Sequence, residues 1–462
     1  MGEGPRGDFE ILAGQLGRIP AVRFDVIVRC HGGHPLVIRN HPFDADGNPF
    51  PNLYWLTCPD ASKAVARLES DGAIGEFNRR LDADPDFALS VERAHAEYAR
   101  ERARNFSETE AWGGVGGTRK GVKCLHAHYA NHLAGGDDLV GSWVASRIGS
   151  IHSETLAGRA AVIDQGTNSI RLLVVEQGED GSPQELARDM IITRLGQDVD
   201  RTGRLDEQAL TRTADVLQRY CRRARALHTT RICMSATSAV RDASNRNELA
   251  EMVLGETGEA LRVISGEREA ELSFLGSASE FDVPGPLLVL DIGGGSTEFV
   301  VGDVVPRQSL SVQMGSVRLT ERFIDHDPAT ARELEAVRGE VARVLDDVDG
   351  LLPIGTARTM IAVAGTATTV QALSLGLQRY DADRIHRSTL VREDVEGVRR
   401  RLGRMTIAEK GALPVMAPGR GDVIVAGVEI LAAVMRRWDF REAFVSEHDI
   451  LDGLAAELLS SR

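Results

Sequence analysis

Two stretches of this 462-residue chain follow one pattern, and this repetition constrains the fold more than any other feature. Residues 162–175 read VIDQGTNSIRLLVV, and residues 289–302 read VLDIGGGSTEFVVG. Each has an apolar run, then Asp, one residue and Gly, a short loop of small residues with Ser, and a second apolar run. An apolar run that reverses at a Gly-containing loop is typical of a β-hairpin. We therefore predict two related subdomains, each with one such hairpin.

Short apolar runs alternate with amphipathic stretches after about residue 158. The runs RAAVIDQG, TTRICMSAT, GPLLVLDIGG and TMIAVAGT each end in small residues, as strands that lead into tight loops do. Between the first two runs, apolar residues recur at a spacing of four, three and four, which places them along one helical face. These residues are Leu210, Ala214, Leu217 and Cys221. The alternation predicts an α/β architecture.

Composition and charge exclude several classes of protein. The chain is 42% hydrophobic and 26% charged, as ordinary globular proteins are, and its length favours two or three domains. It has neither a long uncharged apolar run nor a secretory start, so we expect no membrane span. Five scattered cysteines fit a reducing cytoplasm. A net charge of -14 argues against nucleic acid as a partner, but a polyanionic substrate is possible where metal ions and Arg offset the field.

The two hairpin loops have the composition of phosphate-binding loops. Gly lets backbone N–H groups approach an anion closely, and hydroxyls add donors. Asp164 and Asp291 have the wrong charge for phosphate, but they suit Mg²⁺ or Mn²⁺. One such motif alone is equally well explained as a tight hairpin, whereas two copies at matching offsets favour a cleft that clamps a phosphoryl group. The predicted phosphate-binding residues are Gly166, Thr167, Asn168, Ser169, Gly293, Gly294, Gly295, Ser296 and Thr297.

An ordered series of motifs from about Ala160 to Arg462 resembles the exopolyphosphatase and guanosine pentaphosphate phosphatase family. The matching segments are DQGTNSIRLLV, SATSAVRDASN, VISGEREAELSFLG, DIGGGSTEFV, MGSVRLTERF, VAGTATTV, PGRGDVIVAG and EHDILDGLA. The resemblance implies an α/β fold with two ribonuclease H-like subdomains of the actin, Hsp70 and sugar kinase type around a phosphate-binding cleft. We place these subdomains at 158–285 and 286–462, with the C-terminal helix packing back on the first. A separate small α+β domain, 1–150, precedes them.

The same resemblance assigns roles to single residues. It implies that Glu269, in GEREA, is the catalytic base that activates the attacking water. Arg241 falls in a motif that contributes an active-site Arg. Glu298 follows Asp291 by seven residues, as Arg171 follows Asp164, and this offset would place it near metal-bound water as a further catalytic candidate. Arg171 is a phosphate-binding candidate, and Arg420 is a weaker one at the mouth of the cleft. Guanidinium groups suit phosphate oxygens, although a surface ion pair explains a lone Arg equally well.

The expected function is hydrolysis of terminal orthophosphate from inorganic polyphosphate. Hydrolysis of guanosine pentaphosphate (pppGpp) by the same site is the nearest alternative, because both substrates carry a terminal phosphoanhydride. A catalytically weak sensor of polyphosphate or an alarmone is a second alternative, and a sugar kinase-like enzyme is a third that the Glu269 motif disfavours. A homodimer is a tendency of the family.

Residues 1–150 resemble a bacterial domain of unknown function, on the segments PFPNLYWLTCP and GVKCLHAHYANHLAGGDD. The second segment offers a run of thiol and imidazole groups that can bind Zn²⁺: Cys124, His126, His128 and His132. Cys30, His31 and Cys58 are further candidates. The spacing matches no standard zinc pattern, so core cysteines and hydrogen-bonded histidines are the favoured reading, with a second metal site as the alternative.

Overall fold

The chain folds into two compact units in a computed structural model that describes residues 8–30, 34–43, 50, 52–105, 113–148, 158–178, 182–229 and 231–460. The N-terminal unit comprises Met1–Ala161, Leu172–Asp189 and Leu217–Ile232, and the C-terminal unit comprises Val162–Arg171, Met190–Val216 and Cys233–Arg462. This division follows packing, and the domain boundaries expected from the sequence stay a prediction. The segment between the first two predicted domains, 151–157, lies outside the described residues. None of the helices described is both long and apolar enough to cross a membrane.

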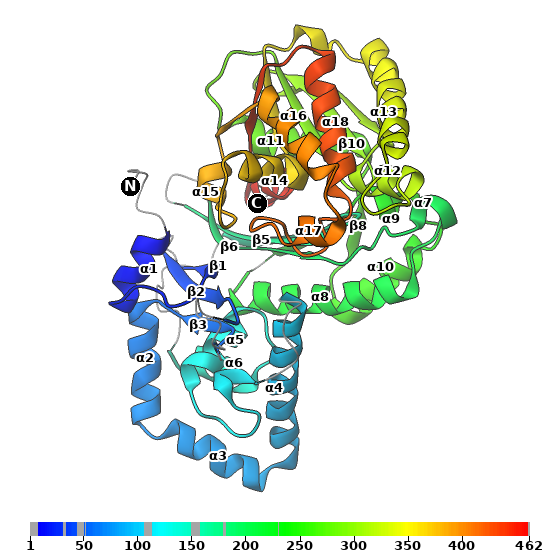
Figure 1. Cartoon of the computed structure of the whole chain (residues 1–462). Helices are drawn as coiled ribbons and strands as arrows, with labels where there is room; N and C mark the ends of the chain where they lie inside the picture. Colours follow the sequence, from blue (N-terminus) through cyan, green and yellow to red (C-terminus); the bar gives the residue numbers. More distant parts are fainter. Residues whose placement is uncertain are drawn as a thin grey trace. The chain divides into compact units, whose positions relative to one another are not determined.

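The first part of the chain is an α+β region with one antiparallel sheet, in the order β1-β2-β3 (Figure 1). Leu12, Phe24 and Ile38 form a small apolar cluster that holds the first helix against this sheet. The elements are α1 (Asp8–Leu16), β1 (Phe24–Arg29), β2 (Pro35–Asn40), β3 (Tyr54–Leu56), α2 (Pro59–Ser70), α3 (Ala73–Ala83), α4 (Pro85–Asn105), the 3₁₀ turn η1 (Val115–Gly117), α5 (Leu125–Leu133) and α6 (Leu139–Ile148).

The next part of the chain forms a sheet in the order β6-β5-β4-β7-β8. Its elements are β4 (Arg159–Gln165), β5 (Ser169–Gln177), β6 (Pro183–Ile192), α7 (Val199–Thr202), α8 (Glu207–Ala226), β7 (Arg231–Ala236), α9 (Ser238–Asp242), α10 (Arg246–Thr257), β8 (Leu261–Val263) and α11 (Gly266–Ala278). The helix predicted from Leu210 to Cys221 is α8. Leu217 and Cys221 are buried in it, whereas Leu210 and Ala214 are only partly buried.

The last part forms a sheet in the order β11-β10-β9-β12-β14-β13. Its elements are β9 (Leu287–Ile292), β10 (Thr297–Gly302), β11 (Pro306–Val312), α12 (Ser316–Phe323), α13 (Ala331–Leu351), the 3₁₀ turn η2 (Ile354–Thr356), β12 (Thr359–Val363), α14 (Ala364–Ser374), α15 (Ala382–Ile385), β13 (Thr389–Val391), α16 (Arg392–Leu402), α17 (Ile407–Gly411), α18 (Ile424–Arg437), β14 (Glu442–Val445) and α19 (Ile450–Ser460).

The two larger sheets share one strand order, which is the repeated sequence pattern expressed in three dimensions. In each sheet the third, second and first strands in chain order lie side by side, and the fourth lies on the other side of the first. The next position is taken by β8 in one sheet and by β14, the last strand of the chain, in the other. The first two strands of each sheet are the predicted hairpins β4–β5 and β9–β10. β9 and β10 pair antiparallel, while β12 pairs parallel to β9. β13 is added at the edge of the second sheet only.

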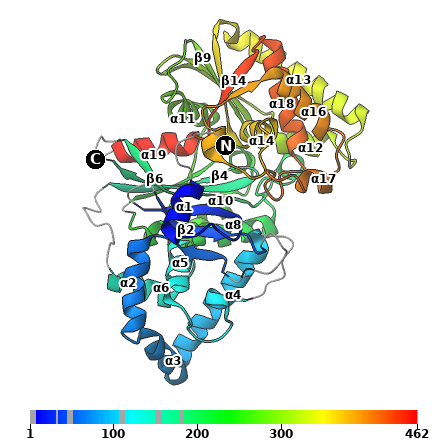
Figure 2. The ribbon, with the colours of Figure 1, turned by 60° about the vertical axis from the view of Figure 1, so that its left-hand side comes forward.

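Strand β9 shows why the second sheet is covered on both faces. Successive side chains of a strand point to opposite faces. Leu287 and Val289 belong to the apolar cluster that includes residues of α11, whereas Leu288 and Leu290 belong to the cluster that includes residues of α13 and α18. Figure 2 shows the helices on either side of this sheet. An apolar run without alternation therefore encodes a fully buried strand.

Helix α19 packs closely against α11. A Cβ atom at Gly276 would lie only 2.0 Å from the carbonyl oxygen of Asp449, and one at Gly453 would lie 2.3 Å from the carbonyl oxygen of Leu272. The two helices also share an ion pair, at 2.8 Å, between Arg268 and Glu457. The glycines therefore permit a backbone approach that places Asp449, just before α19, beside α11.

A buried group of charged side chains ties the segments of the N-terminal unit together. Asp189, on β6, lies 3.1 Å from Arg223 and 3.4 Å from Arg219, both on α8, and 3.8 Å from Arg39 on β2. Arg219 also pairs with Glu101 of α4. Burial opposes the charge of Arg39, but Asp189 and its other anionic neighbours raise the pKa of this guanidinium overall. Electrostatics therefore helps to place the part of β6 up to Asp189 and the part of α8 from Leu217 in the same compact unit as the N-terminal sheet.

Asp189→Asn should destabilise the N-terminal unit strongly. The amide keeps the volume of the carboxylate but leaves buried guanidinium groups without their anion, a change that costs about 3–5 kcal/mol in comparable pairs. Midpoints of thermal and urea unfolding, compared with wild type, measure the effect. The matched control is Asp347→Asn, in an exposed pair with Arg343 in which the side chains are 61% and 68% accessible, so no measurable shift is expected. Equal shifts for the two variants would contradict a structural role for the buried network.

Candidate active site

The turns of the two predicted hairpins have the same hydrogen bond at corresponding positions. The N–H of Gly166 donates to the carbonyl of Ser169 at 2.9 Å, and the N–H of Gly293 donates to the carbonyl of Ser296 at 3.0 Å. Asp164 and Asp291 lie on β4 and β9, each two residues before the Gly. The motif therefore repeats in geometry as well as in sequence.

The two hairpin loops meet face to face. A Cβ atom at Gly294 would lie 2.9 Å from the Cβ of Thr167, and one at Gly295 would lie 2.6 Å from the Oγ of Ser238. Such distances leave no room for a side chain, so glycine is required there for the loops to approach. The structure thus brings the predicted phosphate-binding loops together. It also adds a hydroxyl, that of Ser238 at the start of α9, which the sequence analysis did not select.

Arg171 links two buried carboxylates. It donates to Asp164 Oδ2 at 2.9 Å and also to Asp449, which lies just before α19. The other oxygen of Asp164 accepts a hydrogen bond from the Ser235 hydroxyl at 2.8 Å. Burial opposes the charge of Arg171, but Asp449 and Asp164 raise its pKa overall. Sequence analysis missed Asp449 as a site residue, although it lies in EHDILDGLA, one of the segments that carry the resemblance.

Asp291 and Glu298 face each other across the turn of the β9–β10 hairpin, where they are cross-strand partners. Asp291 accepts a hydrogen bond from the Ser273 hydroxyl at 2.7 Å, and burial and the Asp449 carboxylate raise its pKa to about 6. Burial and Asp291 raise the pKa of Glu298 to about 8. These shifts reflect the cost of holding like charges together away from water.

The two carboxylate oxygens of Glu298 differ in their hydrogen bonds. Oε1 accepts hydrogen bonds from the hydroxyls of Ser296, at 2.6 Å, and Ser311, at 2.7 Å. Oε2 is buried and has no hydrogen-bond partner in the part of the chain that the structure describes. A buried carboxylate oxygen without a donor is costly, so this atom is suited to an external donor or a cation.

Glu269 lies in the first turn of α11 and is paired with Arg241 of α9. The guanidinium is 3.2 Å from Glu269 Oε2, and it also donates to the carbonyl of Ile264 at 2.9 Å. The side chain of Glu269 is 12% accessible. Burial and the carboxylates Glu298, Asp164 and Asp291 raise its pKa well above the ordinary value, against the opposing effect of Arg241. Glu269, Arg241 and the acidic residues therefore belong to one electrostatic cluster.

Arg420 and Arg318 have structural partners close by. Arg420 donates to the carbonyl of Gly365 and to the hydroxyl of Thr369, and burial lowers its pKa. Arg318, on α12, donates to the carbonyl of Gly295 at 2.7 Å and also pairs with Asp242 and Asp200. Arg318 therefore holds the second loop in position. The sequence analysis had not selected it.

The cluster has the donor set of a site for a hard divalent cation. Asp164, Asp291, Glu298, Glu269 and Asp449 outnumber the two guanidinium groups, Arg171 and Arg241, that contact them. The donors are oxygens throughout, and Glu298 Oε2 is unmatched. Mg²⁺ and Mn²⁺ prefer carboxylate oxygens together with phosphate oxygens and water. The residues present thus fit either ion.

Residues 174–461 match the model of the Ppx/GppA phosphatase family, which is more than half of the chain. The chain belongs to the Ppx/GppA phosphatase family. Exopolyphosphatase 2 of Mycobacterium tuberculosis is 44% identical over 313 residues, which cover 65% of this chain and 98% of that protein. Members of this family are phosphatases, and the enzyme class expected from the sequence is confirmed.

Two solved structures support the Ppx/GppA fold. The family member from Aquifex aeolicus has a TM-score of 0.57 at 30% identity, over 66% of this chain and 98% of its own. An exopolyphosphatase from Cytophaga hutchinsonii has a TM-score of 0.61 at 26% identity, over 65% of this chain and 97% of its own. Together with the paired sheets, these relatives confirm the predicted fold class. The α+β region before the Ppx/GppA segment also matches a known family of unknown function, DUF501, over residues 26–146.

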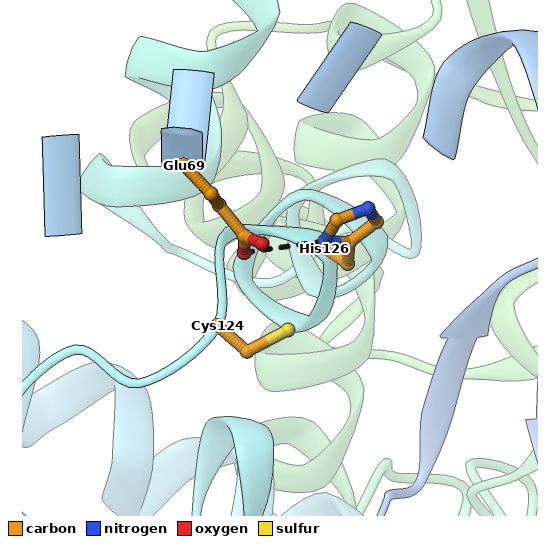
Figure 3. A group of neighbouring side chains, drawn as sticks. All are labelled: Glu69, Cys124 and His126. Carbon is orange, nitrogen blue, oxygen red and sulfur yellow. Dashed lines mark hydrogen bonds and ion pairs between the residues drawn. The ribbon is translucent and has the colours of Figure 1, made fainter. Parts of the chain in front are cut away.

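The thiol and imidazole groups expected near residue 124 do not form one cluster. Cys124 and His126 lie together with Glu69 of α2 (Figure 3). His128 instead contacts both oxygens of the buried Asp138 at 2.9 Å. His126 and His128 are two residues apart on α5, so they point to different sides of the helix. Contact with the Cys124 thiol and the Glu69 carboxylate raises the pKa of His126 to about 9, although burial opposes this.

The predicted four-residue set is therefore corrected. It loses His128 and His132, which are absent from the groups of neighbouring metal-ligand side chains in the described residues, and it gains Glu69. Sequence analysis missed Glu69 because it is distant in the chain. Cys30 and Cys58 are buried and lie outside this group, and His31 lies outside the described residues.

The metal-free protein should become less stable as the pH rises from 6 to 8. The native pKa values of Asp291, about 6, and Glu298, about 8, lie above those of free carboxyl groups. The native state therefore binds more protons than the unfolded state in this range. The excess is mainly at Glu298, because Asp291 releases its proton near pH 6, and stability falls by up to about 1.4 kcal/mol per pH unit. Unfolding midpoints measured with a chelator at pH 6, 7 and 8 test this.

Excess Mg²⁺ should weaken this pH dependence, because the cation favours the ionised carboxylates. Asp291→Asn serves as the matched variant, since it removes the charge that, together with burial, raises the pKa of Glu298, and it should flatten the dependence in the metal-free protein. A metal-free wild type that gains stability from pH 6 to pH 8, relative to Asp291→Asn, would contradict the repulsive cluster.

Proposed function

We propose that this protein is an exopolyphosphatase that releases terminal orthophosphate from inorganic polyphosphate. The observation that carries the proposal is the joint arrangement of two facing Asp–Gly hairpins with the Glu269–Arg241 pair. Exopolyphosphatase 2, which shares 44% identity over nearly its whole length, supports the same substrate class. Hairpins alone would bind a phosphoryl group, and the paired carboxylate adds a group that can act on water.

The loops and the arginines would bind and orient the terminal phosphate. The two loops that meet, Gly166–Ser169 and Gly293–Thr297, would offer backbone N–H groups. The hydroxyls of Ser296 and Thr297 already donate to Glu298 and to the Met314 carbonyl. Arg241 is positioned to donate to a phosphate oxygen, because its contact with Glu269, at 3.2 Å, leaves other guanidinium N–H groups for a ligand. Binding from two sides fixes the phosphorus for in-line attack.

Glu269 is the proposed base. In the reaction a water oxygen bonds to the terminal phosphorus, the bond to the bridging oxygen breaks, and Glu269 accepts the proton that the water loses. The shortened polyphosphate leaves with the bridging oxygen as an anion. Arg241 donates both to the Ile264 carbonyl and to the carboxylate of Glu269. The first contact holds the guanidinium in place, and the second orients the base.

Asp164, Asp291 and Glu298 are the residues that would hold a divalent cation, Mg²⁺ or Mn²⁺. Asp164 and Asp291 are each held by a serine hydroxyl, and Glu298 has an unmatched buried oxygen. When bound, the cation would neutralise charge on the transferred phosphoryl group and on the carboxylates around Glu269, which lowers the pKa of Glu269 toward its ordinary value.

We also propose that the protein works in the reducing cytoplasm, where its five cysteines would stay thiols. A homodimer remains a proposal from the family resemblance, which light scattering of the purified chain tests.

Glu269→Gln should lower kcat for polyphosphate hydrolysis by roughly 10²–10⁴-fold, because the amide cannot accept a proton. Binding of polyphosphate should persist. Phosphate release by purified protein with Mg²⁺ measures this, on long polyphosphate, short polyphosphate and pppGpp in parallel. The matched control is Glu267→Gln, an exposed carboxylate two residues earlier in the same turn of α11, which should hydrolyse at the wild-type rate.

The three substrates separate the alternatives. A higher kcat/KM for polyphosphate supports the proposal, and a higher kcat/KM for pppGpp assigns the same site to the alarmone. A wild type that binds polyphosphate but releases no phosphate from any of the three would favour a sensor and refute the role of Glu269.

A further inference from the structure

A second group of metal-ligand side chains lies in the N-terminal unit, within the domain of unknown function. Glu69 comes from the last turn of α2, Cys124 immediately precedes α5, and His126 lies on the first turn of α5. One carboxylate oxygen, the Cys124 sulfur and one ring nitrogen all lie within 4.8 Å of one another. Figure 3 shows the three side chains gathered in one place from these two segments.

The carbonyl of Ser62 decides which ring nitrogen of His126 faces the group. His126 Nε2 is 3.0 Å from this carbonyl oxygen, which can only accept, so Nε2 carries a hydrogen. In a neutral ring the lone pair is then on Nδ1, which lies 3.2 Å from Glu69 Oε1. A carboxylate oxygen also only accepts. Two acceptors therefore face each other, and either a proton or a metal ion must lie between them.

The surrounding contacts match those of a metal-binding histidine. Such a histidine usually donates its other N–H to a carbonyl or a carboxylate, which fixes the ring and its tautomer. Here the Ser62 carbonyl accepts the hydrogen bond from that N–H of His126. Glu69 is also fixed, because its Oε1 accepts the N–H of Leu125 at 2.7 Å. Two of the three ligands are thus held in position by backbone groups before any ion binds.

A second cluster, in the C-terminal unit, shows the opposite pattern. Glu280, His386 and His448 also bring ligand atoms close together. However, His386 Nδ1 accepts the backbone N–H of Glu447 at 3.2 Å, so its Nε2 must carry the hydrogen that faces Glu280, at 2.9 Å. The proton occupies the place where a metal would bind. His386 therefore directs no lone pair at Glu280, and this cluster provides a comparison for the first.

We propose that Glu69, Cys124 and His126 bind a divalent transition metal ion of the Zn²⁺ type. Sulfur, imidazole nitrogen and carboxylate oxygen are the ligands that zinc prefers, and three protein ligands leave a fourth position for water or an exogenous ligand. The side chains of His126 and Glu69 are 24% and 25% accessible, so the ion can exchange with solvent. The phosphatase site offers oxygen donors only, and hard cations suit it better.

Cobalt titration of the full-length chain tests this proposal. Co²⁺ replaces Zn²⁺ in such sites, and its bond to a thiolate gives a charge-transfer band in the near ultraviolet that oxygen ligands do not give. The protein is first freed of metal with a chelator, and excess Mg²⁺ is then added to occupy the oxygen-ligand site. The wild type should show the thiolate band, which should saturate at one cobalt ion per chain and disappear when Zn²⁺ displaces cobalt.

Variants identify the ligands. Cys124→Ser should lose the band, whereas His126→Gln and Glu69→Gln should keep it with affinity reduced by roughly tenfold or more. Cys30→Ala, which removes another thiol of the same unit, and His448→Gln, in the comparison cluster, should leave the band unchanged. Circular dichroism of each variant shows whether it is folded.

A wild type that gives no thiolate band with excess cobalt at neutral pH would overturn the proposal and leave an imidazolium–carboxylate pair. A band that survives in folded Cys124→Ser would overturn it as well. The measurement needs no polyphosphate hydrolysis, so it stands apart from the test of Glu269.

Discussion

The structure of the C-terminal unit depends on holding several buried carboxylates in one place. Asp164, Asp291, Glu298 and Asp449 are nearly inaccessible to water, and like charges at such sites repel strongly. Arg171 links Asp164 to Asp449, and the hydroxyls of serines from several segments solvate the rest. The hairpins, α11 and α19 must therefore take up fixed positions, because each supplies either an acidic group or one of its partners.

This cluster of buried carboxylates lowers the stability of the folded state. A cluster of apolar residues at the same positions would avoid the repulsion that raises the pKa values of Asp291 and Glu298. Local features that destabilise a fold are expected at functional sites, where a ligand compensates for them. Under the proposed function, a cation and a phosphate together would complete this site, because the cation would offset the carboxylates and the loops would hold the phosphate.

The sequence predicted those parts of the site that are encoded locally. Each Asp–Gly hairpin is contained in one short motif, and Glu269 lies in a segment that the family resemblance identifies. Asp449 was missed although it lies in such a segment, because no local pattern shows that it pairs with Arg171, which is 278 residues away in the chain. The same holds for the prediction of the fold. The hairpins could be predicted, because each lies in one short segment. The shared strand order, and the contacts of Asp189 on β6 with Arg223 on α8 and Arg39 on β2, are long-range and have no local sequence pattern.

Counting donors and acceptors separates clusters that need a ligand from clusters that do not. Glu298 Oε2 is a buried acceptor with no donor in the described chain, and neutral His126 would present a lone pair to another acceptor. His386, by contrast, has its donor and acceptor roles filled by the protein. Composition alone would rank the two carboxylate–imidazole clusters equally. The backbone carbonyl of Ser62 and the backbone N–H of Glu447 distinguish them, because each fixes which ring nitrogen can accept an ion.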